Sequence, residues 1–157
     1  MPVATVAKPI VACELLARAI ELYLRGDSYY SALHLGGAAE EVLVGCARAT
    51  PASSTATLKP TFDQMKDLVV ALSDPVSLEE QKRVENWAYH RMTHAKNSIK
   101  HKRGQSDHTV TFDSKQEAFD TIDRAVSTYY QLLSTLALPH LSAIDDFDSK
   151  ARSERSL

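Results

Sequence analysis

The sequence has few of the features that mark secreted and membrane proteins. Only two of its 157 residues are cysteines, Cys13 and Cys46, and both fall on apolar faces of predicted helices. Two cysteines can form only one disulfide bond, so we expect buried, reduced thiols rather than a disulfide framework. No apolar run approaches the roughly 20 residues that cross a bilayer, and residues 1–4 do not begin a signal peptide. We therefore expect a cytoplasmic protein that makes no contact with membranes.

The alternation typical of β-strands is nearly absent as well, apart from a brief stretch at 109–112. Helical periodicity dominates instead, with apolar residues recurring at intervals of three and four. Leu16 and Ile20 belong to such a face in a helix predicted over 9–25, and Ile122 does in the last long helix. An apolar content of 44% and a charged content of 24% are ordinary for a soluble globular protein. The pattern predicts one all-α domain.

The remaining helices are predicted from their start and stop signals. Gly26 can end the first helix in the left-handed conformation, and Asp27 or Ser28 can cap a second helix that runs to about Ala49. Residues 50–60, rich in Ser, Thr, Ala and Pro, are expected to form a flexible crossover. Three later starts carry a capping box, in which a hydroxyl side chain and a Glu or Gln three residues on bond reciprocally to free amides. These starts are Thr61–Gln64, Ser77–Glu80 and Ser114–Glu117.

The expected architecture is an antiparallel bundle of four to five helices over residues 9–138. Residues 1–8 are expected to be a flexible N-terminus, and residues 139–157 a C-terminal tail that frays. Within the second helix, the stretch Gly36-Gly37-Ala38-Ala39 presents almost no side-chain bulk. A neighbouring helix or a ligand is therefore expected to approach closely there.

Charge is unevenly distributed along the sequence. The segment 82–103 holds seven of the eighteen Lys and Arg residues and a single acidic residue, Glu85, which gives it a formal charge of +6. The whole chain sums to −2, so the remainder carries −8. Such polarity favours a phosphate-bearing or acidic partner at this segment, such as RNA or a nucleotide. The expected phosphate ligands are Arg91, Lys100, Lys102 and Arg103.

Four polar residues of the same segment share one helical face. At 100° per residue, His90, His94, Asn97 and His101 lie within about 60° of one another and roughly 150° from the apolar face. This stripe is expected to face solvent, a cleft or a partner chain. We expect a homodimer built along this helix.

The run Lys96-Asn97-Ser98-Ile99-Lys100-His101, near the end of a long helix in an all-α bundle, resembles the motif of the HEPN superfamily. That motif reads Arg, a polar residue, three variable residues and His. The crossover after the second helix and the Ala-Ala-Glu-Glu stretch at 38–41 are also similar. The resemblance covers about residues 10–138 as architecture and six residues as motif. It implies a metal-independent endoribonuclease that acts as a dimer and needs no cofactor.

The resemblance also implies roles for single residues. His101 would move a proton at the ribose 2′-hydroxyl or the leaving oxygen, Lys96 would stabilise the phosphate charge, and Asn97 would orient the pair. Independently of the resemblance, we expect Glu41 to orient a histidine or lysine across the helix pair. Lys96 stands where the family has arginine and lacks its bidentate fork. In a regular helix it also sits about 140° from His101, so both reach one phosphate only if the helix distorts or a second chain contributes.

Other interpretations of these residues stay open. His90 and His94 are one helical turn apart, a spacing that zinc or nickel accepts, and His34 could be a third ligand. This arrangement resembles the DinB-like metal-binding bundles in outline. The same residues also fit a non-catalytic dimeric scaffold, or a regulatory module that binds a protein partner.

Overall fold

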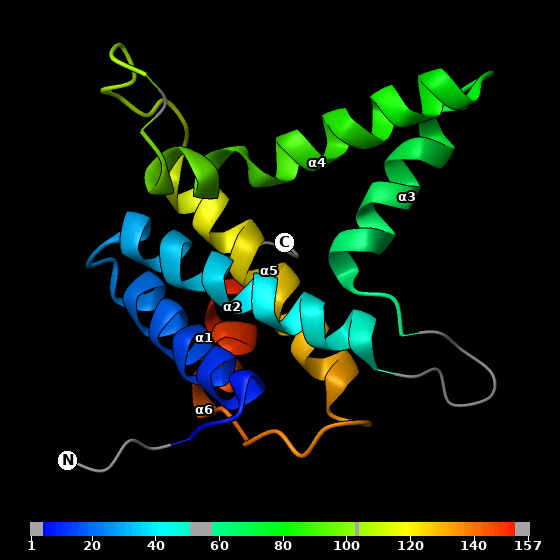
Figure 1. Cartoon of the computed structure of the whole chain (residues 1–157). Helices are drawn as coiled ribbons and strands as arrows, with labels where there is room; N and C mark the ends of the chain where they lie inside the picture. Colours follow the sequence, from blue (N-terminus) through cyan, green and yellow to red (C-terminus); the bar gives the residue numbers. More distant parts are fainter. Residues whose placement is uncertain (1–4, 51–57, 103, 153–157) are drawn as a thin grey trace.

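The computed structural model describes residues 5–50, 58–102 and 104–152. None of these residues lies in a β-strand, so the all-α prediction is confirmed (Figure 1). The helices are α1 (Lys8–Arg25), α2 (Tyr29–Ala49), α3 (Thr61–Ser73), α4 (Leu78–Lys100), α5 (Ser114–Leu132) and α6 (Ser142–Phe147), followed by a π-helical turn at Asp148–Arg152. No helix in the described ranges is both long enough and apolar enough to cross a membrane.

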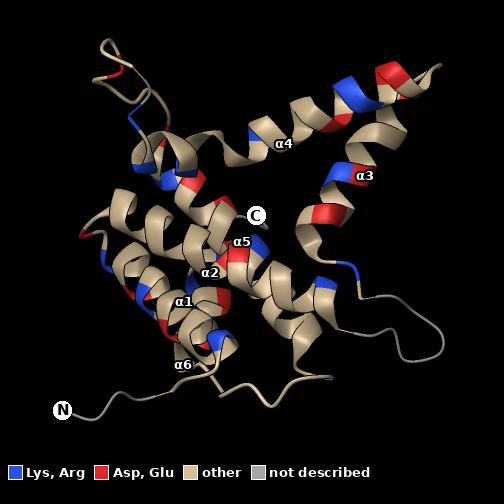
Figure 2. Cartoon of the chain, viewed as in Figure 1, with Lys and Arg blue, Asp and Glu red and all other residues tan. Residues whose placement is uncertain are grey.

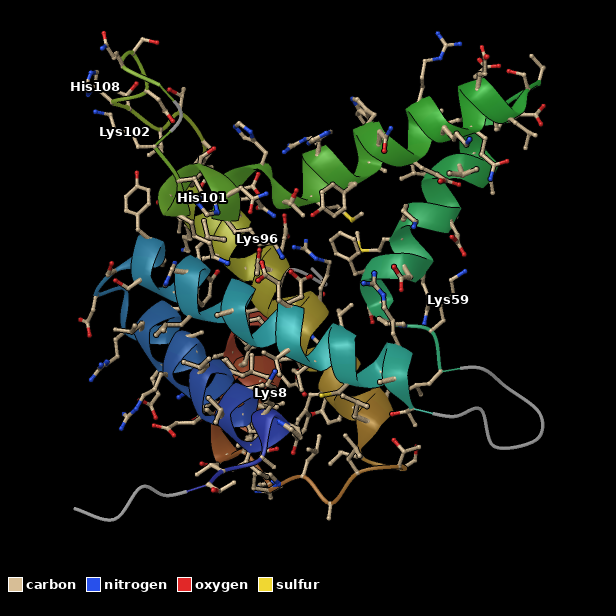
Figure 3. All side chains as sticks on the ribbon, viewed as in Figure 1. Lys8, Lys59, Lys96, His101, Lys102 and His108 are labelled. Carbon is tan, nitrogen blue, oxygen red and sulfur yellow. The ribbon has the colours of Figure 1, made fainter. Side chains whose placement is uncertain are left out.

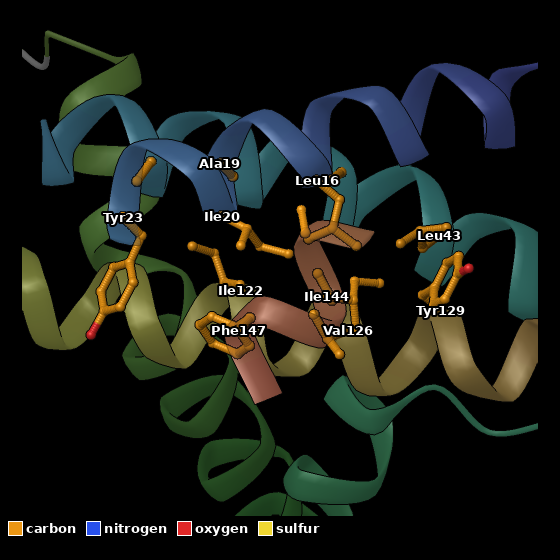
Figure 4. Packing of buried hydrophobic residues seen from close by; sticks show 14 of the residues in the cluster. Leu16, Ala19, Ile20, Tyr23, Leu43, Ile122, Val126, Tyr129, Ile144 and Phe147 are labelled. Carbon is orange, nitrogen blue, oxygen red and sulfur yellow. The ribbon is translucent and has the colours of Figure 1, made fainter. Parts of the chain in front are cut away.

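Helices α1, α2, α5 and α6 surround a common apolar core (Figure 4). Leu16 and Ile20 of α1 and Ile122 of α5 lie in this core and are fully buried. The predicted core faces of the first and last long helices are therefore confirmed at these positions. Since burying one Leu or Ile side chain contributes about 1.5–3 kcal/mol, this cluster supplies a large part of the stability.

Helix α2 is approached most closely where its side chains are smallest. A Cβ atom on Gly36 would lie 3.1 Å from Cγ1 of Ile122, and one on Gly37 would lie 3.1 Å from Cδ of Lys96. These distances are shorter than ordinary van der Waals contact, so the two glycines let α5 and α4 approach α2. The close approach predicted from the small residues is confirmed. At Gly37 the approaching group is the aliphatic part of Lys96.

The helix starts agree only in part with the predicted capping boxes. Ser77 caps α4 as expected, because its hydroxyl accepts a hydrogen bond from the Glu80 amide at 3.2 Å. The Glu80 carboxylate, however, accepts a bond from the amide of Val76 at 3.1 Å instead of the amide of Ser77. Helix α5 is capped by Asp113 rather than Ser114, since a carboxylate there serves as well as a hydroxyl. No side chain caps α3.

The prediction of a frayed tail from residue 139 is wrong for Ser142–Arg152. Helix α6 and the π-helical turn fold back on the bundle, and Ile144 and Phe147 are at most 2% exposed. The ring of Phe147 packs against the ring of Phe119 in α5, with 5.3 Å between the ring centroids. Of the acidic residues that suggested disorder, Asp145 and Asp146 are exposed and Asp148 is half-buried and pairs with Arg152, so the segment is a short amphipathic helix.

Two further predictions of flexible segments fall largely outside the described residues. Residues 1–4 of the expected N-terminal segment and residues 51–57 of the expected crossover are not described. Lys8, which was expected to precede the first helix, is the first residue of α1.

Helix α3 and the N-terminal half of α4 form a hairpin that projects from the bundle, and we refer to residues 61–88 as the arm (Figure 1). The C-terminal half of α4 returns to the bundle and packs against α2. At the base of the arm, the guanidinium of Arg48 in α2 donates two hydrogen bonds to Asp63 in α3, at 2.6 and 2.9 Å. The fold is therefore a helical bundle with a two-helix arm.

Candidate phosphate-binding groove

The positive segment 82–103 does not form one continuous basic surface (Figure 2). Two of its cations lie on the arm, while Lys100 and Lys102 lie at the opposite end of α4. Because an α-helix rises 1.5 Å per residue, the two ends are roughly 30 Å apart. Between them, Arg91 pairs with Glu117 of α5 at 3.2 Å. Folding thus disperses and partly neutralises the charge that the sequence concentrates.

Lys96 belongs to a buried ion network. Its ammonium group lies 3.0 Å from the carboxylate of Glu40, and Nε of Arg124 donates to the other carboxylate oxygen at 2.6 Å. The Arg124, Lys96 and Glu40 side chains are 7%, 5% and 1% exposed. The guanidinium of Arg124 also donates to the hydroxyl of Thr121 at 3.2 Å. One buried carboxylate therefore pairs with two cations from two other helices, and removing it would leave the buried guanidinium of Arg124 without its carboxylate partner.

The burial of Lys96 argues against its expected role as a phosphate ligand. The side chain cannot reach an outside phosphate without leaving Glu40 short of a partner. The ring of Phe62, whose centroid is 5.8 Å from the ammonium nitrogen, covers it from the side of α3. His101, in contrast, is exposed and is the C-cap of α4, where the backbone leaves the helix with φ −127° and ψ 123°. The structure does not bring Lys96 and His101 together.

Asn97 and Glu41 lie at the outer edge of the buried network. With Lys96 they help to line a cavity of about 150 Å³ between α2, α3 and α4. Glu41 accepts a hydrogen bond from Lys100 at 3.1 Å and lies 3.4 Å from Lys96. Partial burial raises the pKa of Glu41, but the hydrogen bond from Lys100 and the charges of both lysines outweigh it, so the pKa lies below its ordinary value. Glu41 thus holds lysines across the helix pair.

A larger hollow lies at the C-terminal end of α4, and we call it the terminal groove. It has a volume of about 540 Å³ and is bounded by the end of α4, by residues 107–110 and by Tyr30 of α2. Lys100, His101 and Lys102 line it from α4 and the residues that follow, and His108 lines it from the next loop segment (Figure 3). Asp107 is the acidic residue among those that line it.

Tyr30 forms the aromatic side of the terminal groove. The ring of Tyr30 packs edge to face against Phe112, with 6.0 Å between the ring centroids. Tyr30 remains 47% exposed, so part of its surface is open to a ligand in the groove. An aromatic side chain beside lysine and histidine suits a ligand that has both a planar group and a negative charge.

The predicted phosphate ligands are divided between different surfaces. Lys100 and Lys102 line the terminal groove. Arg91 lines another hollow, between α4 and α5, together with the carboxylate of Glu117 that pairs with it. Arg103 lies outside the described residues.

The alternative metal site is not assembled within one chain. His34, His90 and His94 are all exposed. In the ranges 5–50, 58–102 and 104–152, no three His, Cys, Asp or Glu side chains gather closely enough to hold a metal ion. The suggestion that His34 joins the two α4 histidines as a third ligand is therefore corrected.

Three residues that the structure makes prominent were not predicted from the sequence. Glu40 lies one turn after Gly36 and Gly37, so the face of close helix approach continues to it, and this spacing could have indicated its burial. Arg124 sits beside apolar core positions of α5 in the same way. His108 lies in a loop with no periodic pattern, so only the fold could place it at the terminal groove. Comparison with protein-family models, curated proteins and solved structures finds no match for this chain.

Proposed function

We propose that this chain binds the phosphate backbone of single-stranded RNA, or a nucleotide phosphate, in the terminal groove. The observation that carries the proposal is that the exposed Lys102, two histidines and an exposed tyrosine line one hollow, beside Lys100, which pairs with Glu41. Lysine and protonated histidine donate hydrogen bonds to phosphate oxygens, and such contacts supply most nonspecific affinity for nucleic acids. Stacking of a base on Tyr30 would add about 1–3 kcal/mol.

The size and surroundings of the terminal groove favour a nucleotide or a single strand over a duplex. Its volume of about 540 Å³ falls within the range of small-ligand pockets, roughly 300–1,000 Å³. Recognition of duplex DNA by a helix requires that the helix enter the major groove, and the terminal groove is concave. Outside residues 82–103 the chain carries −8, a net charge that disfavours binding of a polyanion there.

A second candidate function, metal-independent cleavage of RNA, is favoured by the two imidazoles that line the terminal groove. One neutral imidazole, of His101 or His108, would take the proton of the ribose 2′-hydroxyl as that oxygen bonds to phosphorus. The other, protonated, would give a proton to the 5′-oxygen as its bond to phosphorus breaks. The products are a 2′,3′-cyclic phosphate and a 5′-hydroxyl. The ammonium group of Lys102 would offset the charge that develops on the phosphate oxygens.

The binding proposal is tested with a labelled single-stranded RNA and the double variant His101→Ala/Lys102→Ala. We expect this variant to bind at least about tenfold more weakly than the wild type, since tenfold corresponds to about 1.4 kcal/mol. The matched control is Lys8→Ala/His140→Ala, which removes the same residue types from exposed positions that do not line the groove. Equal binding by both double variants would remove the groove from the proposal.

The cleavage candidate is tested in the same samples with EDTA present. We expect His101→Ala and His108→Ala each to abolish formation of the cyclic phosphate, while His90→Ala, an exposed histidine that does not line the groove, leaves it unchanged. Binding without any cleavage by the wild type would reject the enzyme and retain the binding function.

A further inference from the structure

The arm exposes large apolar side chains that the rest of the described chain leaves uncovered. Leu72, Val76 and Leu78 are 78%, 91% and 76% exposed, and the single tryptophan of the chain, Trp87, is 61% exposed. Soluble monomers rarely gather exposed apolar side chains in one region. A projecting two-helix hairpin has no third helix against which to bury them, so the arm has the composition of an interface.

A groove runs between the two helices of the arm. It has a volume of about 500 Å³ and is lined by Ser73 of α3 and by Glu80, Arg83, Val84 and Trp87 of α4. One acidic side chain, one basic side chain and one large aromatic ring therefore share a face. A second surface with the same three groups could therefore place its basic side chain against this acidic one and its acidic side chain against this basic one.

We propose that a second copy of this chain docks on this groove, with the two arms antiparallel. Glu80 and Arg83 stand at equal distances from the midpoint between Gln81 and Lys82. A twofold axis at that point places Glu80 opposite Arg83 of the partner subunit, and symmetry repeats the pair. Opposite charges thus meet at both places, which argues for a second copy rather than for an unrelated apolar partner.

The same register also covers apolar groups. Trp87 lines the groove, so its ring is covered by the arm of the partner subunit in this register. Two hairpins stacked in this way form a four-helix arrangement in which the exposed side chains of each arm can be covered by the other. This interface lies on the arm and differs from the homodimer that the sequence predicted along the histidine stripe of α4. It lies at the opposite end of α4 from the terminal groove and does not depend on phosphate binding there.

Charge reversal tests the proposed register directly. The full chain is expected to sediment as a dimer at high concentration and to dissociate on dilution, with a red shift of Trp87 emission as the ring becomes exposed. Arg83→Glu and Glu80→Arg are each expected to sediment as monomers, because like charges then face each other across the axis. An equimolar mixture of the two variants is expected to dimerise, since opposite charges face each other again.

A matched control separates the arm from other exposed apolar positions. Val11→Glu alters a 42% exposed residue of α1, outside the arm, and is expected to leave the dimer intact. A wild type that stays monomeric at all concentrations would overturn the proposal. So would two charge-reversal variants that both remain dimeric, or folded variants, by circular dichroism, whose mixture stays monomeric.

Discussion

Among single residues, Glu40 has the largest expected effect on stability. It is 1% exposed and is the carboxylate partner of both Lys96 and Arg124. Glu40→Gln keeps the size of the side chain but removes the carboxylate that pairs with Arg124 and leaves Lys96 with Glu41 as its carboxylate partner. We expect a loss of about 3–5 kcal/mol in the free energy of unfolding, measured by urea denaturation. The half-exposed neighbour provides the control, since Glu41→Gln is expected to cost less than about 1 kcal/mol. A loss at Glu40 as small as that expected at Glu41 would contradict a stabilising role of the buried network.

The glycines of α2 allow a second test at single positions. Gly45 has no atom within 4 Å of a built Cβ, so Gly45→Ala is expected to stabilise the protein by about 0.5–1 kcal/mol through helix propensity. Gly37→Ala has the same propensity gain but must displace the stem of Lys96, whose far end is held by Glu40. We expect a net loss of about 1 kcal/mol. If both variants were stabilised equally in urea denaturation, the close approach of α4 to α2 would be contradicted.

Among the helices, the attachment of α3 to α2 is expected to depend on pH. The hydrogen bonds from Arg48 lower the pKa of Asp63 below its ordinary value, although partial burial opposes the shift. The pair therefore contributes stability above about pH 4, where the unfolded carboxyl is already ionised, and loses it as pH falls through the folded pKa. The stability difference between wild type and Asp63→Asn should shrink on acidification. A difference that stays constant between neutral and strongly acidic pH would contradict this assignment.

Helix α6 is expected to be an integral part of the bundle. Phe147 is fully buried against Phe119 and Tyr23, so Phe147→Ala should cost about 3–5 kcal/mol in thermal or urea unfolding. Leu133 is 43% exposed, and Leu133→Ala is expected to stay within about 0.5 kcal/mol of the wild type. A wild-type midpoint for Phe147→Ala would mean that α6 detaches from the bundle at little cost.

For the whole molecule, the sequence predicted the helices much better than it predicted the site. Apolar spacing located core residues such as Leu16 and Ile122 because helical periodicity is a local property of the chain. The burial of Lys96 could not be predicted in that way, because it depends on Glu40 and Arg124, which lie far away in the sequence. The tail was predicted wrongly because its acidic composition outweighed the few apolar residues that α6 buries.

At the scale of the whole molecule, folding also changes how much of the positive charge of segment 82–103 is available to a ligand. The +6 of segment 82–103 suggested one basic surface, yet Arg91, Lys96 and Lys100 all pair with carboxylates of other helices. The basic side chains proposed to bind a phosphate lie at the end of α4, in the terminal groove, where Lys102 and His101 are exposed. The proposed phosphate site is therefore small and offers few contacts, in contrast to a long basic surface.

The most direct test of this claim is the salt dependence of single-stranded RNA binding by wild type, Lys102→Ala and Lys8→Ala. One phosphate contact contributes about 0.7 to the slope of log affinity against log salt for a single strand. We expect Lys102→Ala to reduce the magnitude of the slope by about 0.7, and Lys8→Ala to leave it unchanged. Identical slopes for the three proteins, or no salt-dependent binding by the wild type, would contradict a phosphate site in the terminal groove.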